Sequence, residues 1–311
     1  MKIWVTNSML RQACQAGVGL IEFFMNHKSH DPFHRWLAEH RPLASEILPD
    51  TFPAYLRGMS FTELTAFRYR ETLKRLIPSV KVREGDRLLD IGPYPGGWDT
   101  LLLEQFGPDI TLDLLGLGLT DEFKNRMPKA CCRFIDFDVD LKNPICRNPD
   151  HSIPISPATY RVVTLLETIE HCYDPLPLLE AIHAGLMPDG RLMITTDNPS
   201  WFGFAYQSLR YQRSIWGPVQ ESHLFNRSNW RPHIRLYTLD DLTYMLNHVG
   251  MEVIASGYFN DHFGLYHISH GELRFRPGFR PMISKLPSFF LPLRIWANRI
   301  WVIAGPTGSP G

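Results

Sequence analysis

The sequence predicts an α/β protein built on a doubly wound sheet, with helices on both of its faces. Short apolar runs alternate with helix-patterned segments from residue 86 onward, which is the pattern of strands joined by crossover helices. A turn rich in glycine and proline, 92–97, follows the first run and leads directly into a helix pattern. At 311 residues the chain is also long enough to bury a full core.

The elements are expected in the following order. Apolar spacing over 8–27 and a Ser-x-x-Glu capping pattern at the start of 60–77 predict helices before the sheet begins. We therefore expect residues 1–58 to form a helical N-terminal extension and 59–311 to form the main domain. The seven expected strands are DRLLDIG (86–92), ITLDLLGLG (110–118), CRFIDFDVD (132–140), YRVVTLLE (160–167), RLMITTDN (191–198), MEVIASGYF (251–259) and RIWVIAG (299–305). The helices between them are GWDTLLLEQFG (97–107), DPLPLLEAIHAGLM (174–187) and LDDLTYMLNHVG (239–250).

Residues 200–235 interrupt this alternation. They are rich in aromatic residues and show neither helical nor strand periodicity. Long segments of this kind in compact domains are usually functional loops, so we expect a lid or a substrate-binding insertion here.

Composition narrows the function classes. Lys+Arg and Asp+Glu both number 32, so the net charge is zero and nucleic acid is disfavoured as a partner. The five cysteines lack C-x-x-C spacing, which favours reduced thiols in a cytoplasmic protein. We expect no signal peptide and no transmembrane segment, because the most apolar late stretch, 286–305, is broken by prolines and arginines. The oligomeric state stays open.

The turn after the first strand has features of a ligand loop. Pro93 and Pro95 favour extended backbone at the residues before them, and Gly96 and Gly97 allow a ligand to approach the backbone closely. The sequence lacks the G-x-G-x-x-G that a dinucleotide would require, which makes an NAD-dependent oxidoreductase a poor fit. A nucleoside-sized ligand is therefore expected.

Asp90-x-Gly92-x-x-x-Gly96 resembles the first motif of the class I S-adenosylmethionine-dependent methyltransferases, in particular the type 11 group. Their usual form is acidic-x-Gly-x-Gly-x-Gly, and Tyr94 replaces the middle glycine here. Residues 160–198 are similar to the fourth and later motifs, including Glu-x-x-Glu-His and a Pro-Asp-Gly turn. The resemblance runs from about residue 60 to about 255, with its motifs in the family's order. It implies a Rossmann-like seven-stranded sheet that binds S-adenosylmethionine.

The resemblance also implies cofactor-binding residues. The expected set is Asp90, Gly92, Pro93, Tyr94, Gly96, Asp113, Gly118, Asp138 and Glu167. For the ribose hydroxyls, alignment favours Gly118 and spacing favours Asp113. For the adenine amino group, Asp138 or Asp136 is the expected acceptor. Arg161 stands where many family members have an aspartate.

The segment ETIEH supplies the expected catalytic residues. Glu170, His171 and the later His233 are candidates to take a proton from the acceptor, with His223 as a further histidine. Glu167, Glu170, His171 and His233 also resemble the metal-binding set of small-RNA 3′-terminal 2′-O-methyltransferases, which implies a possible Mg²⁺ or Mn²⁺ site. Metal-free members carry the same motif, so both interpretations remain open.

The sequence as a whole therefore predicts an S-adenosylmethionine-dependent O-methyltransferase acting on a saccharide or another hydroxylated small molecule. Two alternatives remain. One is a non-catalytic partner protein that keeps the fold, suggested by Tyr94, Gly118 and Arg161. The other is a metal-dependent RNA 2′-O-methyltransferase.

Overall fold

The structure is a computed structural model, and it describes residues 61–93, 96–201, 233–259, 267–269, 272–274 and 297–308. The expected extension over 1–58 and most of the expected insertion over 200–235 lie outside these ranges. Both therefore stay predictions.

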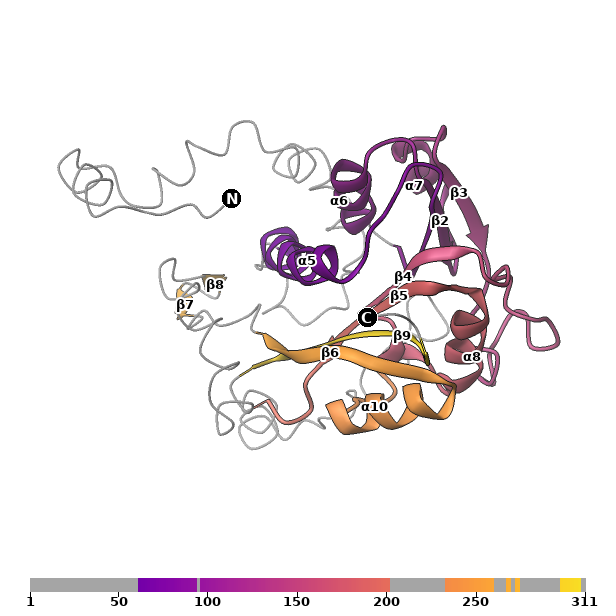
Figure 1. Cartoon of the computed structure of the whole chain (residues 1–311). Helices are drawn as coiled ribbons and strands as arrows, with labels where there is room; N and C mark the ends of the chain where they lie inside the picture. The colour runs from indigo at the N-terminus through magenta and orange to yellow at the C-terminus, as the bar shows by residue number, and fades with distance from the viewer. Residues whose placement is uncertain are drawn as a thin grey trace.

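Seven strands form a single sheet in the order β3-β2-β1-β4-β5-β9-β6 (Figure 1). They are β1 (Arg87–Ile91), β2 (Thr111–Gly116), β3 (Cys132–Asp136), β4 (Tyr160–Leu166), β5 (Leu186–Asp197), β6 (Met251–Phe259) and β9 (Arg299–Pro306). The first five are parallel in their pairings, and β9 runs antiparallel to both β5 and β6. The predicted seven-stranded α/β sheet is confirmed. A separate hairpin of β7 (His267–Ser269) and β8 (Glu272–Arg274) was not predicted.

The helices cover both faces of the sheet. They are α5 (Phe61–Leu76), α6 (Gly97–Phe106), α7 (Asp121–Arg126), α8 (Leu176–Gly185) and α10 (Leu239–His248), with 3-10 turns at Ile77–Ser79 and Ile169–His171. One buried cluster joins side chains of α5, α6 and α7 to the sheet, and a second joins those of α8 and α10 to its other face. Successive strand residues serve opposite faces, as Leu88 and Leu89 do. The sequence analysis did not predict α7. No helix in the described part of the chain is long and apolar enough to span a bilayer.

The side chain of Arg75 on helix α5 contacts aromatic rings of two strands of the sheet. The guanidinium carbon of Arg75 lies 5.1 Å from the ring centroid of Phe259 on β6 and 5.3 Å from that of Trp301 on β9. Contacts of this kind combine electrostatic attraction to the rings with packing of the arginine stem. They help to hold α5 against the sheet, with its earlier residue Arg68 near the carboxyl ends of the strands.

The strand topology indicates that a ligand binds at the carboxyl ends of the parallel strands. These ends form the ligand edge of the sheet. The chain passes from β1 outward to β2 and β3, then crosses back to β4 on the other side of β1. In open α/β sheets, ligands bind beyond the carboxyl ends of the strands where the strand order reverses. Here that position lies between the ends of β1 and β4, at Ile91 and Leu166.

Candidate functional site

The turn after β1 uses two glycines in left-handed conformations. Gly92 has φ +82° and Gly96 has φ +94°, a region that residues with a Cβ adopt only at a cost. The Gly92 amide donates to the carbonyl of Leu115 on β2, and the Gly96 amide donates to the carbonyl of Pro93. Tyr94 lies outside the described residues. Both glycine amides are thus hydrogen-bonded, and α6 begins directly after Gly96.

The same two glycines allow close packing around the turn. A Cβ on Gly92 would lie 2.5 Å from Oγ1 of Thr168, which follows β4. A Cβ on Gly96 would lie 3.1 Å from the ring of Phe123 on α7. A Cβ at Gly92 would overlap Thr168, whereas one at Gly96 would need Phe123 to move by a few tenths of an ångström, so the steric reason for glycine is strongest at Gly92.

Two buried acids lie beneath the turn. Asp90 is 3% exposed and accepts a hydrogen bond from Thr164, whose hydroxyl oxygen also accepts from the indole nitrogen of Trp98 at 3.0 Å. Asp99, in the first turn of α6, is fully buried, and neither of its carboxyl oxygens has a hydrogen-bond partner within the described structure. Burial raises the pKa of Asp90 to about 6, and burial together with the charge of Asp90 raises the pKa of Asp99 well above its ordinary value. Asp90 is thus buried two residues before Gly92 and is hydrogen-bonded to β4.

Replacement of Asp99 by asparagine is expected to stabilise the protein at pH 7 to 8. A carboxyl whose folded pKa is raised contributes stability below its unfolded pKa, near 3.8, and loses it as the pH rises through the folded value. Asparagine removes the carboxyl that becomes charged as the pH rises, so the free energy of unfolding should increase at pH 7.5 and change little at pH 4.5. Urea unfolding at pH 4.5 and 7.5 measures this, with the exposed Asp109→Asn as control. A loss of stability at pH 7.5 would show that another group compensates the Asp99 charge.

The acids predicted after β2 and β3 have different surroundings. Asp113 is fully buried in the middle of β2, where its Oδ2 lies 2.7 Å from a guanidinium nitrogen of Arg87 and accepts from the hydroxyl of Tyr160 at 2.7 Å. Asp113 lies three residues before the carboxyl end of β2, and its Oδ2 is bonded to both of these partners. Gly118 lies just beyond that end, and its amide donates to Oδ1 of Asp136 at 2.7 Å.

The two candidate adenine acceptors also differ. Asp138 is 2% exposed, and its carboxylate accepts from the backbone amides of Asp140 and Arg147. Asp136, the last residue of β3, is exposed at the carboxyl edge. Of these two carboxylates, Asp136 is the one open to a ligand.

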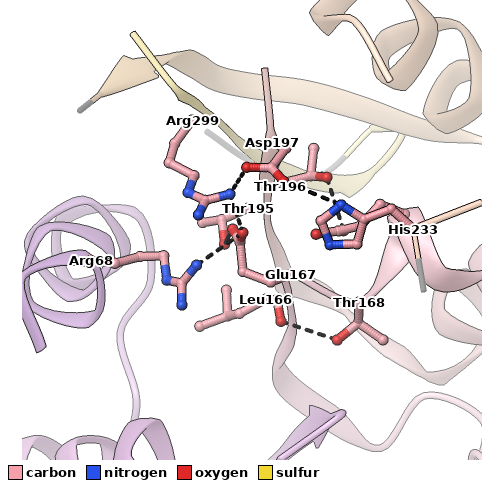
Figure 2. Close-up of polar contacts among 10 residues, drawn as sticks. Arg68, Leu166, Glu167, Thr168, Thr195, Thr196, Asp197, His233 and Arg299 are labelled. Atoms are coloured by element: carbon pink, nitrogen blue, oxygen red, sulfur yellow. Dashed lines mark hydrogen bonds and ion pairs between the residues drawn. The ribbon is translucent and has the colours of Figure 1, made fainter. Parts of the chain in front are cut away.

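Glu167 follows β4 directly and is held by two arginines. It has φ +52°, an unusual conformation for a residue with a side chain. Its Oε2 lies 2.9 Å from Arg68 of α5 and 2.6 Å from Arg299 of β9, and its Oε1 accepts from the hydroxyl of Thr195. Figure 2 shows the two guanidinium groups approaching Glu167 from different elements. Burial alone would raise the pKa of Glu167, but Arg299 and Arg68 outweigh it and lower the pKa to about 2.

Glu170 lies close by, and its pKa is shifted in the opposite direction to that of Glu167. It is fully buried, and Thr196 donates to its Oε2 at 2.9 Å, while Oε1 has no hydrogen-bond partner among the described residues. Burial, and then the charge of Glu167, raise the pKa of Glu170 to about 7, although His233 opposes the shift. The carboxyl therefore exchanges its proton near neutral pH.

Two histidines complete this cluster. The ring centroids of His171 and His233 are 4.7 Å apart, with the rings edge to face. The backbone carbonyl of Glu170 accepts from the amide of Ile234 at 2.8 Å, which places His233 beside Glu170 although it is far away in sequence. One ligand atom from each of Glu170, His171 and His233 lies within 4.8 Å of the others. The structure thus brings together all three predicted catalytic residues. His223 lies outside the described residues.

The sequence analysis missed three members of the site: Arg68, Asp197 and Arg299. Asp197 ends β5, forms an ion pair with Arg299 and lies 3.4 Å from Nδ1 of His233. Its position at the carboxyl end of a predicted parallel strand was a usable signal. Arg68 and Arg299 gave none, because an arginine in a helix or strand pattern is normally assigned to the surface.

Arg161 does not belong to the site. It is near the beginning of β4, at the opposite edge of the sheet, where it pairs with Asp86 at 3.2 Å and with Asp189. Its departure from the family pattern therefore has no bearing on the ligand edge.

Comparison with known proteins shows the family to which the chain belongs. Residues 62–256, more than half of the chain, match the family described as a methyltransferase domain. The ubiquinone biosynthesis O-methyltransferase of Marinobacter nauticus is 29% identical over 121 residues, which make up 38% of this chain and 44% of that relative. The match thus spans less than half of the relative's length.

Two solved structures are also similar. A methyltransferase in complex with the Trm112 methyltransferase activator of Haloferax volcanii is 15% identical, with a TM-score of 0.50 over 91% of this chain and 99% of that one. An S-adenosylmethionine-dependent methyltransferase from Mesorhizobium loti is 13% identical, with a TM-score of 0.48 over 78% and 97%. The first of these shares the fold. On the family match over 62–256, the chain belongs to the methyltransferase-domain family.

Proposed function

We propose that this protein transfers a methyl group from S-adenosylmethionine to a hydroxyl group of a saccharide or another hydroxylated small molecule. The observation that carries the proposal is the meeting of two features at the ligand edge. Two glycines with positive φ follow β1, and Glu170, His171 and His233, of which Glu170 is buried, come together beyond the end of β4, the neighbouring strand. The first suits a nucleoside ligand, and the second suits removal of a proton.

The glycine turn fits the cofactor on steric grounds. Gly92 and Gly96 hold positive-φ conformations that suit residues without a Cβ, and glycine is the residue at which a ligand can approach the backbone most closely. The sulfonium of S-adenosylmethionine supplies an electrophilic methyl group. Glu167 and Asp136 are the proposed further contacts, since they lie at the carboxyl ends of β4 and β3, the strands on either side of the β1–β2 pair.

The cluster of Glu170, His171 and His233 would take the acceptor's proton. The acceptor oxygen would gain the methyl group as the S–CH₃ bond of the sulfonium breaks and S-adenosylhomocysteine leaves, and the hydroxyl proton would pass to Oε1 of Glu170 or to one of the two imidazoles. Glu170 is the favoured base, because Oε1 is buried without a partner among the described residues and Thr196 fixes the other oxygen. A base whose pKa matches the working pH is the most effective kind.

Support for the acceptor class is of two kinds. The relative from Marinobacter nauticus is named as an O-methyltransferase, and the cluster described above is suited to an acceptor that must lose a proton. The saccharide part of the proposal comes from the sequence alone, from Arg227, Trp230 and Arg231 in a segment outside the described residues.

Calorimetric titration with S-adenosylhomocysteine tests the cofactor part first. Micromolar binding is expected. Transfer of a radiolabelled methyl group is then measured on a panel of monosaccharides, oligosaccharides and phenols, with RNA oligonucleotides as a separate arm. No binding of S-adenosylhomocysteine would favour a non-catalytic partner protein, and label in the RNA arm alone would favour the RNA methyltransferase alternative.

The proposed four-residue metal site does not fit the structure well. Both of the closest cations to Glu167 are guanidinium groups, and a carboxylate held by two arginines is a poor ligand for a divalent ion. Glu170, His171 and His233 remain as three donors. The proposed methyl transfer therefore relies on the side chains of the protein alone. Titration with Mn²⁺ and Mg²⁺, before and after chelation, is the test; a stoichiometric signal lost in His233→Gln would restore the metal interpretation.

A further inference from the structure

Arg299 reaches the site because its strand runs backwards. β9 is antiparallel to β5, so its first residue lies at the edge where β4 and β5 end. Arg299 is paired in register with Asp197 on β5 and with Phe259 on β6. Its side chain is 8% exposed. The antiparallel direction of β9, the last strand in sequence, thus places a buried cation at the carboxyl ends of β4 and β5.

One guanidinium nitrogen of Arg299 bridges two carboxylates from neighbouring strands. Nη1 lies 2.6 Å from Oε2 of Glu167 and also contacts Oδ1 of Asp197 (Figure 2). Two carboxylates this close repel each other unless a cation lies between them. Glu167 also keeps a backbone conformation, φ +52°, that persists only where the surroundings enforce it.

One carboxylate belongs to a residue next to the glycine turn, and the other lies beside a proposed base. Glu167 precedes Thr168, whose hydroxyl bonds to the Ile91 carbonyl next to the glycine turn. Asp197 lies 3.4 Å from Nδ1 of His233. We infer that Arg299 is a positioning residue for the proposed methyl transfer, acting on the cofactor side through Glu167 and on the acceptor side through Asp197; the inference rests on the proposed function.

Arg299→Lys is the variant that separates positioning from charge compensation. Lysine keeps the buried positive charge, but its nitrogen lies one bond short of the position that Nη1 of arginine reaches, so it cannot contact both carboxylates from the same backbone position. A role limited to charge compensation would be rescued by lysine. Arg161→Lys is the matched control, since Arg161 is also buried between two acids but lies at the opposite edge.

Two readouts are needed. Calorimetry gives the affinity for S-adenosylhomocysteine, and ¹⁵N NMR of labelled histidine gives the ring resonances of His233, assigned by their loss in His233→Gln. In Arg299→Lys, we expect affinity to fall about 10-fold or more and the His233 resonances to move toward those of a solvent-exposed imidazole. In Arg161→Lys, both should match the wild type.

Each other outcome has a definite meaning. Unchanged affinity and unchanged His233 resonances in Arg299→Lys would overturn the inference. A change in affinity alone would overturn the part that acts through Asp197. If the wild type fails to bind S-adenosylhomocysteine, the proposed function fails, and the His233 resonances alone then decide whether Arg299 positions this histidine.

Discussion

Substitution of Glu170 by glutamine is expected to lower the rate of methyl transfer by about 100-fold or more, with little effect on S-adenosylhomocysteine affinity. Glutamine has the shape of glutamate, and its amide oxygen can still accept the hydrogen bond from Thr196. It cannot accept a proton at neutral pH, however. Radiolabel transfer to the best acceptor of the panel measures the rate, and the exposed Glu180→Gln on α8 is the control.

The raised pKa of Glu170 adds a pH dependence. The folded value is about 7 against 4.5 ordinarily, so the carboxylate form, and with it the wild-type rate, should increase between about pH 6 and 8. The Glu170→Gln variant should lack this rise. An equal loss of cofactor affinity in the variant would show that Glu170 mainly holds the loop, and full activity would assign the proton to His171 or His233.

Glu170→Gln should also raise the stability of the protein at pH 8, although it lowers the activity. Because the folded pKa is raised, the protonated Glu170 contributes stability that is complete below pH 4.5 and is lost as the pH rises through about 7. The shift corresponds to about 3 kcal/mol at pH 8. Glu170→Gln is therefore expected to be more resistant to urea than the wild type at pH 8 and nearly equal to it at pH 4.5. Lower activity with higher stability is characteristic of a residue kept for function.

The sequence allowed the sheet to be predicted because its strands carry a local signal. The runs around Leu88, Leu114 and Val163 are fully buried in the structure, as continuous apolar strands of a parallel sheet should be. Helix α7 was missed because it is only six residues long, Asp121–Arg126, and too short to show a period. The start of β5 at Leu186 was missed as well, because Pro188, Asp189 and Gly190 are typical of a turn.

The site was predictable only where its residues are close in sequence. Glu167, Glu170 and His171 lie within one short segment, and the spacing alone suggested that they work together. Asp113 showed the limit of that reasoning. Its position in the chain allowed a ligand role, but its burial and its pairing with Arg87 depend on which face of β2 meets which neighbour. Likewise, Arg299 becomes a site residue only through the antiparallel direction of β9.

Gly92→Ala is the second substitution with a large expected effect, because it combines two separate costs. A residue with a Cβ at φ +82° costs about 1–2 kcal/mol in backbone conformation. The new Cβ would also lie 2.5 Å from Thr168 Oγ1, an atom held by bonds to the carbonyls of Ile91 and Leu166. Either the Thr168 side chain or the ends of β1 and β4 would have to move, so we expect S-adenosylhomocysteine affinity to fall about 100-fold, which corresponds to about 2.7 kcal/mol.

Two further variants separate these costs. Gly85 has φ +81°, and a Cβ added to it would meet no atom of the described residues within 4 Å, so Gly85→Ala carries the backbone cost without the contact. It should lower the unfolding temperature but leave the affinity for S-adenosylhomocysteine unchanged. Gly92→Ala combined with Thr168→Ala removes the hydroxyl that the new Cβ would meet, and it should recover part of the lost affinity. If Gly92→Ala binds S-adenosylhomocysteine as tightly as the wild type, the ligand does not lie against this turn, and the assignment of the cofactor to the crevice between β1 and β4 is wrong.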